Sequence, residues 1–485
     1  MKTYQDFQKI KAENDNKKVL SFVLSAIEEY KNSDMYEMAV LADEYDRHQN
    51  RTMVQFQKFL YTLSGSVVPD NISANYKMTN NFFHRFVNQQ NQFLLGNGVS
   101  WNNASTQKKL GKDFDTVLQK LGKIAIVQGV AYGFWNYDHL EAFEAKSFVP
   151  LFDEVTGALM AGIRFWRVDD TKPLRATLYE IEGATEMIWS YGEDKGNYIL
   201  DNGEVTDTPN TQSYKNNYRT TEIDGIQFVD GENYPSLPIV PLWANENKQS
   251  EFVGMQEQID CYDLIKSGFA NDLDDASQIY WILHNAGGMD DKDIALFLQR
   301  LKTIHVAQVE GDGATAEAHT LDVPYDARNQ LLDRIEKDLY KDFMALNPET
   351  IANGAVTATQ IKAAYEPLNT KSIQYEYQVI DFLNGILELA GIDGEEPSFT
   401  RSMIVNAQEE INSVLASAQY LPEDYIVGKL LDFLGDGDKK EKILKQLDED
   451  EMDRFGSIKK TQEVPAPQDG ESSTEGQQSE VAPTE

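Results

Sequence analysis

The stretch Leu237-Pro238-Ile239-Val240-Pro241-Leu242 opens the part of the chain that decides its fold. Its β-branched residues, bounded by prolines, predict a strand. After Gln249, apolar residues recur at helical spacing and predict a helix that ends near Asn271-Asp272. A compact insert, residues 276–322, separates this helix from a second one that runs from about Tyr325 to Leu346. Two long helices around a small insert are uncommon in enzyme cores, and they are typical of helices that line a space shared between subunits.

A third helix in this region is unusually long. Thr357-Ala358-Thr359-Gln360 matches a capping box, and the helical pattern continues to Ala390, just before Gly391. This helix would span about 50 Å at 1.5 Å per residue. Pro367 predicts a kink roughly three turns into it.

The insert between the first two helices predicts a small mixed unit. Strands are expected at residues 279–283 and 303–309, with a short helix at 290–301 between them. Residues 317–321 are a further strand candidate.

The rest of the chain divides into a helical and a β-rich part. Residues 17–60, 80–95 and 108–130 predict helices, of which the phenylalanine-rich Asn80 to Leu95 is the clearest, and Gly96-Asn97-Gly98 is expected to stop it. Residues 131–242 predict antiparallel strands separated by turns, and residues 406–454 an acidic helical region. The fold class predicted from these patterns is α+β.

Size and charge limit the class of protein. A chain of 485 residues exceeds the usual single core, so two to four subdomains are expected. It carries 79 acidic against 44 basic residues, a net charge of −35. Such an excess argues against a protein that grips nucleic acid over a wide surface, because that requires clustered cations. It suits a soluble protein, or one past which a polyanion slides without sticking.

The cysteine count and the N-terminus indicate the compartment. Cys261 is the single cysteine, so no disulfide can form within one chain and a reducing compartment is expected. Residues Met1 to Asn16 are polar and lack a signal-peptide core. No apolar run approaches the roughly 20 residues that span a membrane. We therefore expect a protein without membrane association that is made in the cytoplasm.

A search for catalytic and metal-binding patterns finds none. There is no Gly-x4-Gly-Lys-Ser/Thr loop, no HExxH and no GxSxG. His84, beside two phenylalanines, is better explained by packing or capping than by metal ligation. Cys261 is interpreted as a small core residue. The acidic groups Asp272-Leu273-Asp274-Asp275 and Asp436-Gly437-Asp438 lack the remainder of a calcium loop, which favours solvated helix ends over a metal site.

Three cations on the helix from Tyr325 to Leu346 admit two explanations. Arg334, Lys337 and Lys341 share one face, among several acids. They could form a solvated face, with ion pairs between Asp333 and Lys337 and between Asp338 and Lys341, which have the required spacing. Alternatively, repetition of the helix by symmetry would place them as a ring of cations around a channel.

The order of these segments resembles that of portal proteins of tailed double-stranded DNA bacteriophages, of the siphophage type. The resemblance spans roughly residues 30–450, and no single motif in it is diagnostic. Its stretches are Phe93-Leu94-Leu95-Gly96-Asn97-Gly98-Val99; Leu237 to Glu246, leading to Ile259-Asp260-Cys261-Tyr262-Asp263, Ser267 and Asn271-Asp272; Thr357-Ala358-Thr359-Gln360-Ile361-Lys362-Ala363 and the long helix after it; and the acidic C-terminal helical region.

The resemblance implies a portal fold whose long helices surround a central channel in a ring, usually of twelve subunits, at one capsid vertex. The implied subdomains are a wing (1–249, N-terminal helices and then the antiparallel β region), a stem helix (250–275), a clip (276–322), a second stem helix (323–346), a tunnel loop (347–356), a long wing helix (357–399), a crown (400–457) and a disordered acidic tail (458–485).

The resemblance also implies the function and the partners. The ring would be the channel for DNA packaging and ejection, without catalytic activity or cofactor. Its partners would be copies of itself, double-stranded DNA bound transiently and without sequence specificity, the terminase large subunit, the major capsid and scaffolding proteins and a head–tail adaptor. The tunnel loop, with Asn347, Glu349, Thr350, Asn353 and Gly354, would lie nearest the DNA, and Arg334, Lys337 and Lys341 would be the few lumenal cations.

That loop departs from a basic, phosphate-binding pattern. It is neutral to acidic, polar and small. Tight contacts to phosphates through Lys and Arg would have to break each time the DNA moved, so the composition suits a conduit better than a clamp. Two alternatives stay open from the sequence: another structural head–tail connector, and a metal-dependent nuclease that uses the Asp clusters.

Overall fold

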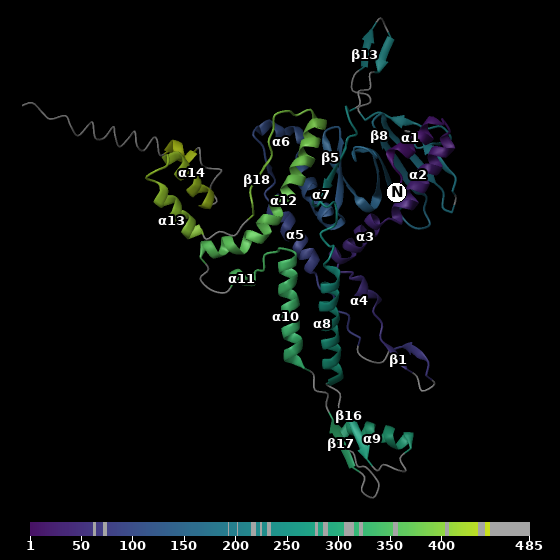
Figure 1. The fold of residues 1–485 in the computed structure, drawn as a ribbon, viewed down its shortest axis with the longest axis vertical. Coiled ribbons are helices and arrows are strands. Elements are labelled where there is room, and N and C mark those ends of the chain that lie inside the picture. The colour runs from purple at the N-terminus through teal and green to yellow at the C-terminus, as the bar shows by residue number, and fades with distance from the viewer. Residues whose placement is uncertain are drawn as a thin grey trace, which may run out of the picture. The chain divides into compact units, whose positions relative to one another are not determined.

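The computed structural model describes residues 1–61, 65–70, 75–192, 194–200, 202–214, 220–223, 226–229, 234–276, 280–284, 290–304, 315–319, 324–352, 357–402, 407–434 and 442–446 (Figure 1). The chain divides into two compact units. The first comprises Met1–Gly354 and Lys362–Met403, and the second Ala355–Ile361 and Ile404–Glu485. Helices and antiparallel strands are both well represented, so the α+β class is confirmed.

Helices dominate the N-terminal part of the first unit, as the sequence predicts. Asp15 caps the second helix by accepting the backbone N–H groups of Lys17 and Lys18, and Ser33 caps the third. The helices are α1 (Tyr4–Ala12), α2 (Asn16–Lys31), α3 (Asp34–Asp46), α4 (Arg51–Gln55), α5 (Phe82–Leu95), α6 (Ala104–Leu110) and α7 (Phe114–Gln128).

The predicted stop after α5 is confirmed, with a detail that the sequence left open. The helix ends at Leu95, and Gly96 keeps a right-handed conformation. Gly98 is the residue with positive φ, at 74°. A Cβ at that position would lie 2.9 Å from a carboxylate oxygen of Asp115, so the turn requires glycine for both conformation and space.

The β-rich part forms two main antiparallel sheets. The larger has the order β11-β10-β9-β8-β7-β6, with β12 also paired to β9, and the smaller has the order β15-β4-β5. Their strands are β4 (Val130–Asn136), β5 (His139–Glu144), β6 (Phe148–Phe152), β7 (Leu159–Trp166), β8 (Leu174–Glu180), β9 (Gly183–Trp189), β10 (Gly196–Ile199), β11 (Val205–Thr206), β12 (Thr211–Gln212) and β15 (Ile239–Trp243). The opening stretch of the sequence is therefore an edge strand, where proline is tolerated.

Three further pairs of short strands are antiparallel. Two are hairpins, β1 (Phe59–Tyr61) with β2 (Val67–Pro69) and β13 (Thr220–Ile223) with β14 (Ile226–Val229), and the third joins β3 (Val99–Ser100) to the distant β18 (Ser398–Phe399).

Two large apolar clusters hold the first unit together. One packs α1 and α2 against the larger sheet, with Trp189 and Tyr198 fully buried beneath Phe7 and Phe22. The other is built from α3, α5, α7 and the long C-terminal helix, and it takes in Phe252 from the turn before the helix that follows β15 and Ile259 from that helix. Burial of these side chains is the main source of stability.

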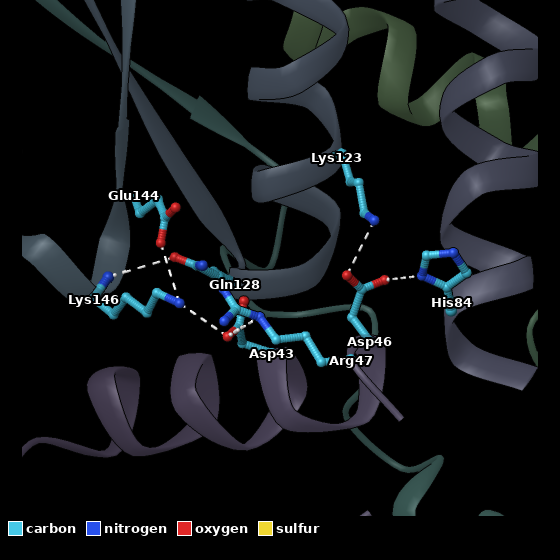
Figure 2. Close-up of polar contacts among 8 residues, drawn as sticks. All are labelled: Asp43, Asp46, Arg47, His84, Lys123, Gln128, Glu144 and Lys146. Atoms are coloured by element: carbon cyan, nitrogen blue, oxygen red, sulfur yellow. Dashed lines mark hydrogen bonds and ion pairs between the residues drawn. The ribbon is translucent and has the colours of Figure 1, made fainter. Parts of the chain in front are cut away.

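Ion pairs at the C-terminal half of α3 tie this helix to its neighbours (Figure 2). Asp43 accepts from Lys146 at 2.9 Å. Asp46 lies between Lys123, at 3.1 Å, and His84, at 2.9 Å. All five side chains are at least half buried, so the pairs fix how α3, α5, α7 and the turn before β6 lie together. His84 therefore has a structural role in this group of ion pairs.

The region after β15 follows the predicted order. It consists of α8 (Gln256–Ala276), β16 (Tyr280–His284), α9 (Asp291–Ile304), β17 (Thr315–His319) and α10 (Tyr325–Asp342). β16 pairs antiparallel with β17. The strand expected at 303–309 is wrong at its start, because Thr303 and Ile304 end α9, and its remaining residues lie outside the described part.

The interpretation of Cys261 as a core residue is also wrong. Its side chain is exposed, because it lies on the opposite side of α8 from the buried stripe that includes Ile259 and Asp263. One residue corresponds to a rotation of about 100° around a helix.

The capping box and the long helix are confirmed. Gln360 N–H donates to the Thr357 hydroxyl at 3.3 Å, and the Gln360 side chain accepts from Thr357 N–H at 3.0 Å. α12 runs from Ala358 to Ala390 with Pro367 inside it, and Figure 1 shows the helix bent.

The second unit contains α13 (Ala407–Ser417) and α14 (Glu423–Leu434), in the region predicted to be helical. The tail expected to be disordered after Ile458 lies outside the described residues. Within the described ranges, no helix combines the length and apolar character that a bilayer crossing requires.

Candidate functional site

The helices α8 and α10 form an antiparallel pair (Figure 1). At one end Gln258 donates to Asp342 at 2.5 Å. At the other end the rings of Phe269 and Tyr325 lie 5.7 Å apart, centroid to centroid. Arg328 forms an ion pair with Asp272 at that same end. Contacts at both ends hold the two helices side by side in antiparallel orientation.

The three predicted cations lie on the side of α10 away from this contact. Arg334 and Lys341 are 81% and 75% exposed, and Lys337 is exposed as well. The buried side of α10 is formed instead by Leu339, and Phe343 at the C-cap is buried as well. The structure therefore brings the three cations together on one open face, as the helical spacing predicts.

The ion pairs of this face differ partly from the expected ones. Asp338 forms ion pairs with Arg334 at 3.7 Å and with Lys341 at 3.6 Å. The expected pair of Asp338 with Lys341 is therefore present, whereas a pair of Asp333 with Lys337 is not found among the described residues. Long, exposed ion pairs contribute little to stability, so stability alone does not explain the cations.

The segment after α10 is held by an amide side chain of α5. The Gln89 amide donates to the Leu346 carbonyl at 3.0 Å and accepts from the Leu346 N–H at 2.9 Å. This double contact reproduces the hydrogen bonds of a β bridge. It fixes the backbone just before the predicted loop 347–356.

Lys371 of α12 holds the same segment from a second side. Its ammonium group donates to the Phe343 carbonyl at 3.0 Å and lies 3.2 Å from the centroid of the Phe343 ring. It also pairs with Glu251 at 2.8 Å, and both side chains are largely buried. Burial lowers the pKa of Lys371, and the neighbouring Glu251 carboxylate opposes that shift. A cation at the last carbonyls of α10 also meets the negative end of the helix dipole.

We name Gln89 and Lys371 the loop anchor. Sequence analysis missed both residues. Lys371 carries a signal in retrospect, because it lies on the apolar stripe of α12 between Leu368 and Tyr375, where a lysine requires a buried partner. Gln89 carries no such signal, since glutamine is common on helix surfaces.

The first residues of the predicted loop form one helical turn, α11 (Glu349–Ala352). Asn347 begins it, because its side-chain oxygen accepts the Glu349 N–H at 3.0 Å and its carbonyl accepts the Thr350 hydroxyl at 2.6 Å. Glu349 and Thr350 are exposed. Asn353 and Gly354 lie outside the described residues.

The acidic groups that suggested a nuclease give that alternative no support. Asp272 forms the ion pair with Arg328 described above. Asp436-Gly437-Asp438 lies outside the described residues. In the part of the chain that the structure covers, no three His, Cys, Asp or Glu side chains gather as metal ligands would.

The antiparallel helix pair around a small insert, followed further along the chain by a helix of 33 residues, has the order of elements that the sequence predicted. Residues 31–453 match the family of phage portal proteins described as SPP1 Gp6-like. The chain belongs to this family of phage portal proteins.

Two individual relatives agree with the family match. The chain is 25% identical to the portal protein of Bacillus phage SPP1 over 399 residues, which cover 73% of this chain and 72% of that protein. It is 30% identical to the portal protein of Clostridium phage phiCD119 over 202 residues. That second match spans 40% of this chain and less than half, 45%, of the phiCD119 protein.

Proposed function

We propose that copies of this chain close into a ring, usually of twelve subunits, at one vertex of a phage capsid. The hole of the ring is the channel through which double-stranded DNA enters during packaging and leaves during ejection. The observation that carries this proposal is the antiparallel pair of α8 and α10 around the β16-α9-β17 insert, within a chain whose residues 31–453 match the portal family.

The subdomains that we propose follow the order of the elements. Residues 1–249 form the wing, α8 and α10 the two stem helices, and residues 276–322 the clip. Residues 347–356 form the tunnel loop, 357–399 the long wing helix, 400–457 the crown and 458–485 an acidic tail. The loop anchor then sets where the tunnel loop leaves the stem.

The charge of the chain supports a conduit rather than a clamp. With a net charge of −35, most surfaces of a ring repel DNA. Arg334, Lys337 and Lys341 would be the few cations that face the DNA, each available for a brief phosphate contact. Because every such contact must break as the DNA advances, a small number keeps resistance low.

The partners that we propose follow from this position in the virion. The clip would dock the terminase large subunit during packaging and a head–tail adaptor afterwards. The outer surfaces of the ring would contact the major capsid and scaffolding proteins. We assign the ring no catalytic activity and no cofactor.

Electron microscopy of the purified protein tests the proposal. We expect rings with a central hole wide enough for duplex DNA. Particles that stay monomeric at all protein and salt concentrations would refute it. A magnesium- or manganese-dependent nuclease activity that Asp272→Asn abolishes would replace it with the nuclease alternative.

A further inference from the structure

One face of α8 carries a ladder of buried polar side chains. Asp263, Ser267 and Asn271 recur every four residues, and each is nearly inaccessible to solvent. Polar groups are buried at a cost unless they find hydrogen-bond partners. The partners of this ladder show what lies against it.

The ladder binds the extended segment that precedes α5. Asn271 accepts the Tyr76 N–H at 2.7 Å, Ser267 accepts the Met78 N–H at 2.9 Å, and Asp263 accepts the Asn80 N–H at 3.1 Å. Four helical residues rise about 6 Å, and two extended residues rise about 6.6 Å. The two spacings match, so every second N–H of the segment meets one step of the ladder.

Further bonds fix the residues before this segment to the same helix. Asn50 donates to Asp263, and Thr52 donates to Asp260 at 2.6 Å. Tyr45 also donates to Asp260 at 2.6 Å. The chain on both sides of the β1–β2 hairpin is therefore bound to α8.

We call the described residues 54–61, 65–70 and 75–80 the arm. Hydrogen bonds hold its residues 76–80 to α8, whereas several of its apolar side chains are exposed to solvent. Phe59 is 59% exposed and Val67 is 56% exposed. The exposed apolar residues of the arm are Val54, Phe56, Phe59, Val67, Val68 and Tyr76. Such a concentration on a short segment is typical of an interaction surface.

The charge of the arm is opposite to that of the chain as a whole. It carries Lys58 and Lys77 against a single acid, Asp70, in a chain of net charge −35. The sequence of α8 contains six acids and one lysine. An acidic helix of another copy therefore complements the arm, although the copies as wholes repel each other.

A groove between α8 and α10 offers a matching surface. It has a volume of about 460 Å³, and its lining includes Cys261, Ile335 and the acids Glu257, Asp338 and Asp342. Leu331, one turn before Ile335, is 45% exposed beside it. Cys261 lies two residues from the ladder residue Asp263, about 200° around α8, so the arm of the same copy is bound to a different face.

We propose that the arm of one copy docks into the groove between α8 and α10 of the next copy. Arm and groove lie on different faces of each copy, so the contact is head-to-tail, and contacts of this kind generate rings when the rotation closes. The exposed apolar side chains of the arm would cover Leu331 and Ile335, and Lys58 and Lys77 would approach the acids of the groove. This inference rests on the proposed ring and names one of its interfaces.

A double substitution, Phe59→Ser with Val67→Ser, tests the apolar contact. Both side chains are exposed in the single copy, so the variant should keep the urea midpoint of the wild-type chain. The protein concentration for half assembly, measured by sedimentation velocity, should rise by about tenfold or more, because apolar burial at the interface is lost. Val155→Ser, a change at a residue that is 90% exposed in the turn between β6 and β7, is the matched control and should assemble as the wild type does.

Cross-linking to the native Cys261 tests the geometry. In Phe59→Cys a short bismaleimide should give covalent dimers and higher multiples, and these should vanish in Phe59→Cys with Cys261→Ser. Val155→Cys should give none.

The outcomes separate this inference from the proposed function. Rings that form normally in the double variant, with no cross-linked multiples, would overturn the arm contact and leave the channel proposal standing. Normal rings that fail to enter capsids would also overturn it, since the arm would then bind a capsid or scaffolding protein. A wild-type chain that forms no rings would overturn both.

Discussion

Lys371→Met should show how strongly the loop anchor holds the junction of α10 and α12. Methionine keeps most of the volume of the side chain but removes its charge. Glu251 then lacks its ion-pair partner at 2.8 Å, and the Phe343 carbonyl lacks its donor at 3.0 Å. Removing one member of a buried ion pair costs about 3 to 5 kcal/mol. Since Glu251 keeps a hydrogen bond from Asn245 at 2.9 Å, we expect the lower end, about 3 kcal/mol.

Urea unfolding followed by tryptophan fluorescence measures this loss as a shift of the midpoint. Glu251→Gln in the Lys371→Met background supplies the matched control. The second change removes the unpaired charge, so the double variant should recover at least about 1 kcal/mol relative to additivity. A loss below about 0.5 kcal/mol in Lys371→Met, or strict additivity of the two changes, would refute the reasoning.

Three further predictions concern the ladder, the loop anchor and the cations. Burial raises the pKa of Asp263 from 3.8 to about 6, so the stability that its protonated form contributes is fully present at low pH and is lost as the pH rises through about 6. In Asp263→Asn the fall in the urea midpoint between about pH 4 and 7 should therefore become shallower, and an unchanged slope would contradict this. Gln89→Leu should lower the free energy of unfolding by about 2 kcal/mol, because it leaves the backbone N–H and carbonyl of Leu346 without the side chain that binds them. Hydrogen exchange at the Leu346 amide should accelerate, and equal exchange in both proteins would show that Gln89 does not hold this segment. Changing Arg334, Lys337 and Lys341 together to Gln should alter stability by less than about 0.5 kcal/mol but change the rate of DNA packaging in a complementation assay; normal packaging would remove them from the channel lining.

The main elements around the insert were predictable because their signals are local. Helical periodicity predicted α8, α10 and α12, and the capping box at Thr357 marks the start of α12. The ends of α8 and α10 differ from the prediction by about four or more residues, because α8 spans Gln256–Ala276 and α10 ends at Asp342. The order of these segments was enough to indicate the portal family. The position of Arg334, Lys337 and Lys341 on one face also followed from spacing alone.

Features that depend on partners distant in the sequence were not predictable. Gln89 meets Leu346 across 257 residues, and Asp263 meets Asn80 across 183. The polar residues Asp263, Ser267 and Asn271 were noted only as part of a family pattern. Their burial, and the arm that explains it, could not be read from α8 by itself. The exposure of Cys261 was misjudged for a different, local reason, because this residue lies off the buried stripe of α8.

The sequence by itself determined which segments are helices or strands, their order and the overall acidity, because hydrophobic period, caps and charge are written in neighbouring residues. The tertiary structure alone decided which polar groups meet, which side of each helix stays open and where the arm exposes its apolar residues. Hydrogen bonds and burial depend on distances in space. Residues 45–80 reach α8 only when the chain has folded, so patterns among neighbouring residues do not show these contacts.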